Sequence, residues 1–407
     1  MKNKIYFKFS PAVFCVLIIL LFTIGIQGQE ASISLQEALD KGWKNNTGLS
    51  SSRDGQEYGK VLEGSAWNPD QPQIYYHYDQ NNIAENGHPI EVWGVTQQFR
   101  FPTIYGARKK VFREETNLNR IQYVMDSLET GAQISKSYVS AVYYNNLVKT
   151  YRAIDSLYQE FSRAADRKFE VGDANELEQL TARANYKEVN MTLQKHLASY
   201  KNSVQVLNSW IQDESSTYVP VEDSLVVLPL IPEIANEIPA VEMMRSQQRL
   251  EEKKLSLEKQ SLLPDLHLSY FQGTNGYPGA KTYSGVQFGI SVPLWFTASA
   301  ARTKATRIAV DRKTNAVNDL ATHTRSRLEA LNNQLQIQKE RMAYHNEEGA
   351  TLATRILQQA KVAYSAGELD YLQYLQLLQA AMNTAVARLN AIYDYDMTVI
   401  TLNYFYE

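Results

Sequence analysis

Several short stretches of the chain alternate apolar and polar side chains, and they predict β-strands. In "EVWGVTQQFRFP", Trp93, Val95 and Phe99 fall on one face, whereas Thr96 and Gln98 fall on the other. "TYSGVQFGISVP" and "DLHLSYFQ" follow the same rule. A period of two residues is typical of a strand with one apolar and one polar face. The pattern alone fits lipid-facing strands and a soluble sandwich equally well.

Long helices are predicted by apolar positions that recur every three or four residues. One such seam comprises Leu147, Tyr151, Ile154, Tyr158, Phe161 and Ala165, and another comprises Leu372, Leu375, Gln379, Met382, Val386, Leu389 and Tyr393. This spacing is typical of coiled coils. Residues 103–171 and 298–366 contain no proline. Each would form a rod of about 100 Å at a rise of about 1.5 Å per residue, so the rods must pack side by side.

Three landmarks occur twice in the same order, which predicts two tandem repeats. "PQIYYHY" at 72–78 resembles "PDLHLSY" 192 residues later. "QQFRFP", which ends at Pro102, resembles "FGISVP", which ends at Pro293. "FEVGD" around Gly172 resembles "YSAGE" around Gly367. Each half of the chain therefore contains a strand pair followed by a long helical hairpin with a glycine at its turn.

The repeats set the expected domain boundaries. The first repeat is 29–212, with strands at about 72–101 and a helical hairpin at about 103–211. The second is 241–407, with strands at about 264–293 and a hairpin at about 298–405. Residues 213–240 form a linker between the repeats, which we place at the equator of the body. The linker contains Pro220, Pro229, Pro232 and Pro239, and proline interrupts helices. An ordered linker and a loose one are both compatible with this composition.

Residues 1–28 are expected to be a secretory signal peptide. Lys2, Lys4 and Lys8 precede an apolar run that ends near Ile26, and small residues follow, as in cleaved export signals. The alternative is an uncleaved membrane anchor. No later apolar run approaches the length of a spanning helix. If the mature chain crosses a membrane, it must therefore use strands in a closed barrel, because lipid offers no partners to backbone groups.

The composition and motifs exclude several classes of function. The chain has 41 basic and 44 acidic residues, so it lacks the basic surface expected for nucleic-acid binding. Its only cysteine, Cys15, lies inside the predicted signal. No phosphate-binding glycine loop, nucleophile elbow or zinc-protease motif is present, and the histidines lack ligand spacing. We expect a protein that is not an enzyme and that has no cofactor, no metal site and no nucleic-acid partner.

The ordered set of motifs resembles the TolC-type outer membrane efflux proteins. "ISLQEALDKGWKNN" at 33–46 is similar to the opening segment of that family, and "AYSAGELDYLQYLQ" at 363–376 is similar to one of its helical turns. The strand pairs that end at Pro102 and Pro293 complete the resemblance, which extends over the whole mature chain.

The resemblance implies an α+β membrane protein with long antiparallel α-helical coiled-coil hairpins and four transmembrane β-strands per chain. Three copies would form a homotrimer with one twelve-stranded β-barrel in the outer membrane lipid and an α-helical tunnel across the periplasm. The family's partners are a periplasmic adaptor, also called a membrane fusion protein, and an inner-membrane pump, which we expect to be of the RND type. The chain would be the passive outer membrane channel of this efflux system. "FPTIYGARKK" at 101–110 resembles the version found in cation exporters and points to heavy-metal cations as cargo, with drugs as the alternative.

The resemblance also implies a periplasmic gate at the two turns marked by Gly172 and Gly367. The candidate gate residues are Glu176, Glu178, Tyr364, Glu368, Asp370, Gln373 and Gln376. Tyr364 and Glu178 match a tyrosine and an acidic residue that are bonded in the closed gate of a family member, whereas Leu369 replaces the arginine. Gln373 and Gln376 replace the family's cation-selective carboxylates. The plain alternative is that acidic residues near a turn are solvated or cap the next helix.

The competing class of protein is a soluble periplasmic coiled-coil scaffold or adaptor. An adaptor normally has one helical hairpin beside a lipoyl-like β domain. Two repeats, each with a strand pair before its helices, favour the channel.

Overall fold

The structure is a computed structural model, and it describes residues 29–80, 87–231 and 238–405. The predicted signal peptide, residues 1–28, lies outside the described residues. The described chain divides into two compact units, one formed by 29–45 and 140–225 and the other by 46–139 and 226–405. The boundary falls inside a helix and does not follow the two sequence repeats. The repeat boundaries at 29–212 and 241–407 therefore stay a prediction.

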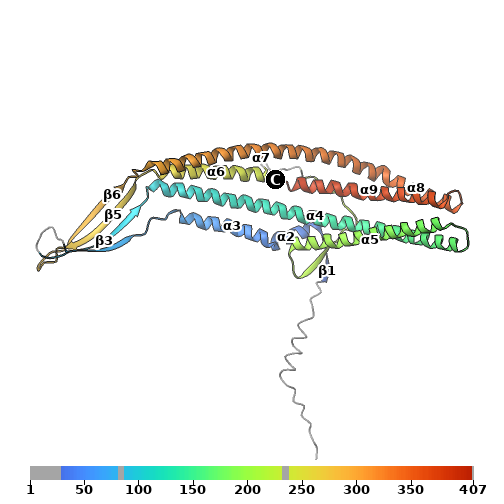
Figure 1. Ribbon diagram of the computed structural model, residues 1–407, viewed down its shortest axis with the longest axis horizontal. Coiled ribbons are helices and arrows are strands. Elements are labelled where there is room, and N and C mark those ends of the chain that lie inside the picture. The colour runs from blue at the N-terminus through green and yellow to red at the C-terminus, as the bar shows by residue number, and fades with distance from the viewer. Residues whose placement is uncertain (1–28, 81–86, 232–237, 406–407) are drawn as a thin grey trace, which may run out of the picture. The chain divides into compact units, whose positions relative to one another are not determined.

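The first unit combines helices with a small parallel sheet (Figure 1). Strand β1 (Gln29–Ile33) pairs with β4 (Ser216–Pro220). Helix α2 (Leu35–Asn45) contacts α5 (Glu176–Ile211). The remaining helix of this unit is the second part of α4 (Pro102–Glu170). Because β4 lies in the predicted linker and is paired, that part of the linker is ordered.

Helix α5 ends in a polar cluster around Asp213. Gln212 takes the left-handed conformation at the helix end, with φ of 52°. The Asp213 carboxylate then accepts hydrogen bonds from the hydroxyls of Ser215 and Tyr218 and from Lys41 Nζ, at 2.6, 2.7 and 3.1 Å. The bonds from Ser215, Tyr218 and Lys41 hold the pKa of Asp213 well below its usual range. The cluster ties α2, α5 and β4 together.

The second unit contains a four-stranded antiparallel sheet. Its strands are β2 (Gln73–Asp79), β3 (Ile90–Phe99), β5 (Asp265–Thr274) and β6 (Tyr283–Ser291), in the order β2-β3-β5-β6. The alternation of side chains, together with the tandem repeat, predicted the two strand pairs. The structure adds the pairing of β3 with β5, which joins the pairs into one sheet and places Val95 opposite Tyr270.

Several helices pack alongside one another in this unit (Figure 1). After α3 (Thr47–Glu63) and the short η1 (Gly64–Ala66), the unit contains the first part of α4 and α6 (Pro239–Gln260). It ends with α7 (Phe296–Tyr344), the π-helical η2 (His345–Gly349), α8 (Ala350–Ser365) and α9 (Tyr371–Asn403). Helix α6 packs on α7, and α9 packs on α7 and α8.

The two predicted rods differ from each other. Helix α4 runs for 69 residues without interruption, as predicted. It begins at Pro102, where proline suits the first helical turn. The second rod begins at Phe296, three residues after Pro293, and contains a π-helical segment at His345–Gly349. The sequence analysis did not predict this segment.

The buried faces confirm one seam and correct the other. Leu147, Ile154 and Tyr158 are buried on α4, as predicted. In the first three turns of α9, Leu372 and Gln379 are exposed, Leu375 is buried as predicted, and the other buried residues are Tyr374, Leu378 and Ala381. Apolar side chains surround the start of α9, so the periodicity could not select one face there. Packing against α8 selects it.

Candidate functional site

Both glycine turns have the same backbone structure. Gly172 and Gly367 have φ of 83° and 73°, a left-handed conformation that favours glycine. In the first turn, Gly172 N donates to Phe169 O at 3.1 Å, and Asp173 N donates to Lys168 O at 2.8 Å. Gly367 and Glu368 repeat these bonds after α8, at 3.1 and 2.9 Å. Each turn is thus a Schellman motif, in which glycine ends the helix.

The residue three positions beyond each glycine caps the next helix. Asn175 Oδ1 accepts from Glu178 N at 2.9 Å, and Asp370 Oδ1 accepts from Gln373 N at 2.8 Å. In the second turn, Gln373 Oε1 also accepts from Asp370 N at 3.1 Å, which completes a capping box. Asp370 and Gln373 therefore have a structural role at the start of α9.

The predicted gate residues divide between the two units. Glu176 and Glu178 lie in the first turn of α5, and Glu178 is half-buried. The others lie beside the second turn, where Glu368, Asp370, Gln373 and Gln376 are exposed and Tyr364 is half-buried. The structure brings Asp370 and Gln373 together. A bond between Glu178 and Tyr364 stays a prediction.

Tyr364 stacks on a residue that the sequence analysis missed. Its ring lies 4.6 Å from that of Tyr374 between centroids, with 17° between the planes. Tyr374 is buried, and burial raises its pKa. The two rings join the end of α8 to the start of α9. Tyr364 lies three residues before Gly367 and Tyr374 lies seven residues after it, so the packing of α8 against α9 brings the rings together.

Below the first turn, a carboxylate joins α4 to α5. Asp166 Oδ1 accepts from Gln179 Nε2 at 2.9 Å and from Arg183 Nε at 2.8 Å. The bonds from Gln179 and Arg183 lower the pKa of Asp166. Beside the turn itself, Val171 and Leu177 expose most of their side-chain surface. The second turn likewise exposes Val362 and Leu372.

The sheet has one apolar face that the described chain leaves uncovered. Its exposed members are Ile74, Tyr76, Tyr78, Trp93, Val95, Leu268, Tyr270, Val286, Phe288 and Ile290. Ile74 and Phe288 expose 76% and 80% of their surface. Tyr76 packs against Trp93 across the strand pair, with centroids 4.6 Å apart. The opposite face carries Thr96 and Ser269, whose hydroxyl oxygens lie 2.7 Å apart.

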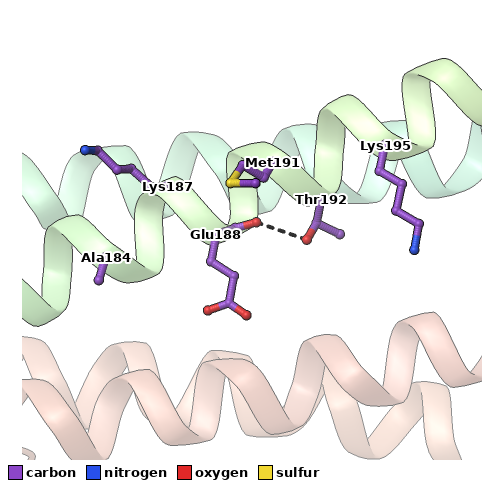
Figure 2. A pocket seen from close by; sticks show the side chains of 6 residues that line it. All are labelled: Ala184, Lys187, Glu188, Met191, Thr192 and Lys195. Carbon is purple, nitrogen blue, oxygen red and sulfur yellow. Dashed lines mark hydrogen bonds between the residues drawn. The ribbon is translucent and has the colours of Figure 1, made fainter.

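A shallow depression of about 520 Å³ lies on α5, away from the turns (Figure 2). Its lining is Ala184, Lys187, Glu188, Met191, Thr192 and Lys195. The Thr192 hydroxyl donates to the carbonyl of Glu188 at 3.0 Å and is thus engaged with its own helix. No converging set of catalytic groups lines the depression.

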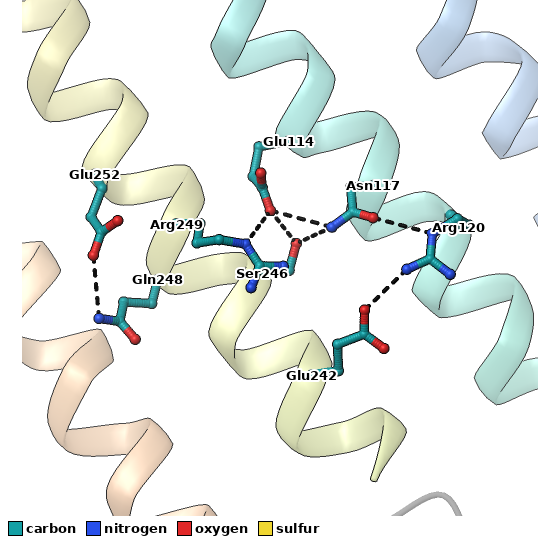
Figure 3. A network of polar contacts seen from close by, with 8 residues as sticks. All are labelled: Glu114, Asn117, Arg120, Glu242, Ser246, Gln248, Arg249 and Glu252. Atoms are coloured by element: carbon teal, nitrogen blue, oxygen red, sulfur yellow. Dashed lines mark hydrogen bonds and ion pairs between the residues drawn. The ribbon is translucent and has the colours of Figure 1, made fainter. Parts of the chain in front are cut away.

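A polar network holds the first part of α4 against α6 (Figure 3). Glu114 Oε1 accepts from Ser246 Oγ at 2.7 Å, Arg249 Nε at 2.9 Å and Asn117 Nδ2 at 3.3 Å. Arg120 extends the network to Glu242 at 3.0 Å. Burial raises the pKa of Glu114, but the bonds from Ser246, Arg249 and Asn117 outweigh it, and the net shift is downward. The network therefore joins α4 to α6.

Among residues 29–80, 87–231 and 238–405, no three His, Cys, Asp or Glu side chains gather as metal ligands do. Within the same residues, no helix is both long and apolar enough to cross a membrane.

Solved structures share this combination of long helices and a four-stranded antiparallel sheet. CmeC, an outer membrane channel of Campylobacter jejuni, matches with a TM-score of 0.75 at 15% identity, over 93% of this chain and 90% of that chain. A membrane protein of Pseudomonas aeruginosa matches with a TM-score of 0.77 at 11% identity, over 95% of each chain. The open-state MtrE outer membrane channel of Neisseria gonorrhoeae gives 0.70 at 12%, over 91% and 88%.

No protein-family model and no curated protein matches the sequence. The structural matches cover nearly the whole chain, so the predicted fold is confirmed: the chain has the fold of the TolC-type outer membrane channels.

Proposed function

We propose that this protein is the outer membrane channel of a tripartite efflux system and that it performs no chemistry. The observation that carries the proposal is the uncovered apolar face of the sheet β2-β3-β5-β6. A face of this size in water would drive association or aggregation. Lipid covers such a face without cost, and the polar face then lines a water-filled path.

The sheet also requires further strands if it lies in lipid. Its outer strands, β2 and β6, each have one edge without a strand partner among the described residues. Unpaired backbone groups are too costly in a bilayer to remain. Four strands cannot close around a channel. We therefore propose a homotrimer in which three copies supply the twelve strands of one barrel in the outer membrane.

The helical parts support the periplasmic half of the proposal. Helix α4 alone, with 69 residues, has a length of about 100 Å at about 1.5 Å per residue, which exceeds the thickness of a bilayer. The helices would form a tunnel that extends into the periplasm. The exposed Val171, Leu177, Val362 and Leu372 beside the turns suit contact with a periplasmic adaptor, behind which an inner-membrane pump of the RND type supplies energy.

The turns are proposed as the gate. Acidic side chains repeated once per copy form rings that favour cations and repel anions. Glu176 and Glu178 supply such carboxylates at the first turn, and Glu368 and Asp370 supply them at the second. At the second turn, Gln373 holds the capping box with Asp370, so its uncharged side chain contributes structure where a charge was expected.

Heavy-metal cations remain the predicted cargo, with drugs as the alternative. A deletion strain tests this directly. Increased sensitivity to copper, zinc, cobalt or nickel salts, with unchanged sensitivity to antibiotics, would support metal export. The opposite pattern would support drug export.

The channel itself is tested by fractionation and by a matched pair of substitutions. The wild-type chain should appear in the outer membrane as heat-modifiable, SDS-resistant trimers and should conduct ions in planar bilayers. Phe288→Arg on the apolar face should impair assembly, since arginine on a lipid face costs about 2–4 kcal/mol at mid-bilayer. Gln287→Arg, one residue away on the polar face, should assemble normally. A soluble periplasmic monomer would contradict the proposal and favour a scaffold or adaptor.

A further inference from the structure

The glycines of the sheet all lie on its polar face. The strand register places Gly94, Gly273, Gly285 and Gly289 on the same side as Thr96 and Ser269. Glycine weakens a strand and often marks a place where another group approaches closely. The side chains that lie close to these glycines therefore show which groups approach the polar face.

Two of the glycines lie beneath aromatic rings. One row across the sheet reads Tyr75, Gly94, Phe271 and Gly285, from β2 to β6. A Cβ atom at Gly94 would come within 3.0 Å of Cζ, Oη and Cε1 of Tyr75. A Cβ atom at Gly285 would come within 3.0 Å of Cζ and Cε2 of Phe271. Each ring thus lies over the glycine of the next strand, and both rings lean toward β6.

This position differs from the usual direction of strand side chains. Side chains in a sheet stand roughly perpendicular to it. Tyr75 and Phe271 instead extend sideways along the sheet surface, with the far ends of their rings against Gly94 and Gly285. Tyr75 and Phe271 can take this conformation because Gly94 and Gly285 have no Cβ atom in the space that the rings occupy.

We propose that Tyr75 and Phe271 line the water-filled path of the channel and that Gly94 and Gly285 keep this path wide by allowing both rings to lie flat. The inference rests on the proposed function, which makes the polar face the lumen. The row contains no charged residue, so it would sort cargo by size rather than by charge. In a trimer, six such rings would line the lumen.

Single-channel conductance of the full-length chain in planar bilayers tests the proposal. Tyr75→Ala and Phe271→Ala should increase conductance, because they remove the rings. Gly94→Ala should decrease it, because the new methyl group forces the Tyr75 ring away from the sheet and into the path. Gly94→Ala should have no effect in the Tyr75→Ala background, which is the signature of two groups that act through one contact.

Two controls are available in the same sheet. Tyr76→Ala removes a ring of the same size on the opposite face and should leave conductance at the wild-type value. Gly289→Ala adds a methyl group on the same face, where the nearest atom is His267 Cβ at 3.5 Å, an ordinary contact. This variant should also conduct normally.

The outcomes separate this inference from the proposed function. A wild-type chain that forms no channels would contradict the proposed function. The inference alone would be overturned if the wild-type chain forms channels and Gly94→Ala leaves their conductance unchanged. It would also be overturned if Gly94→Ala lowers conductance as much in the Tyr75→Ala background as in the wild type. Assembly is checked by heat-modifiability on gels. If Gly94→Ala does not assemble, the pair Gly285→Ala and Phe271→Ala provides the same test independently.

Discussion

The backbone N–H of Leu228 donates a 2.8 Å hydrogen bond to Oδ1 of Asp396, a fully buried carboxyl group on α9. Its other oxygen, Oδ2, is buried without a hydrogen-bond partner in the described chain. Three residues further along, Ile231 N donates to Asn403 Oδ1 at 2.8 Å, and Asn403 Nδ2 donates to Pro229 O at 3.0 Å. Asp396 and Asn403 thus attach this part of the linker to α9.

Asp396 should make stability depend on pH. Burial raises its pKa from 3.8 to about 7, although the bond from Leu228 opposes the shift. Between these two values the folded chain binds more protons than the unfolded chain, so the free energy of unfolding should fall as pH rises from about 4 to about 7. The decrease is on the order of 4 kcal/mol, at about 1.4 kcal/mol per pKa unit.

The measurement is thermal or denaturant unfolding, followed by circular dichroism, across this pH range. Asp396→Asn keeps the acceptor for Leu228 without a charge and should be more stable than the wild type at pH 8. Asp394→Asn is the control, because Asp394 is only half-buried and pairs with Arg341 at 3.1 Å. If Asp396→Asn leaves the pH dependence of the free energy of unfolding unchanged, the Asp396 carboxyl group does not cause that dependence.

The polar network between α4 and α6 should stabilise the fold only above acid pH. The lowered pKa of Glu114 means that its contribution is complete above the unfolded pKa of about 4.5 and disappears as pH falls through the folded pKa. Glu114→Gln should lower the free energy of unfolding by about 1 kcal/mol at pH 7, because it removes the negative charge to which Ser246 and Arg249 donate hydrogen bonds. Glu252→Gln, also drawn in Figure 3, affects only a bond to Gln248 on its own helix and should be neutral. Equal losses for both variants would argue against the assignment.

The glycines of the two turns should resist substitution. Gly172→Ala and Gly367→Ala each place a Cβ atom in a left-handed conformation, which costs about 1–2 kcal/mol. Gly55→Ala lies inside α3, where nothing beyond the adjacent residues and the helix's own backbone lies within 4 Å of the new methyl group, and it should stabilise the helix by about 0.5–1 kcal/mol. Urea unfolding of the three variants measures these differences. Turn variants as stable as the wild type would show that the left-handed conformation is not required.

Glu178 tests the proposed gate. Glu178→Ala should loosen the closed state, so it should increase single-channel conductance and antibiotic uptake. Glu188→Ala makes the same change ten residues later on the same helix, at an exposed position that Figure 2 labels, and should leave both readouts unchanged. Wild-type conductance together with wild-type sensitivity in Glu178→Ala would argue that Glu178 only begins α5.

Features that depend on neighbouring residues could be predicted from the sequence, whereas features that depend on packing could not. The left-handed glycines and the 69-residue α4 follow from signals within a few residues, and the structure has them where they were expected. The predicted buried face at the start of α9 was wrong because Leu372 and Tyr374 can both be buried in a core, and only the packing of the helices buries Tyr374 and exposes Leu372. The stacking of Tyr364 on Tyr374 was missed because it requires two helices to meet at a particular angle.

Periodicity, glycine and proline act through neighbouring residues, so they predicted the four strands of the sheet, the uninterrupted α4 and the two glycine turns. The pairing of β3 with β5, the position of Tyr75 over Gly94 and the bond from Leu228 to the buried Asp396 follow from the tertiary structure alone. These contacts join residues that lie far apart in the chain or on neighbouring strands. Their existence depends on the packing of whole elements, which no short pattern of residues encodes.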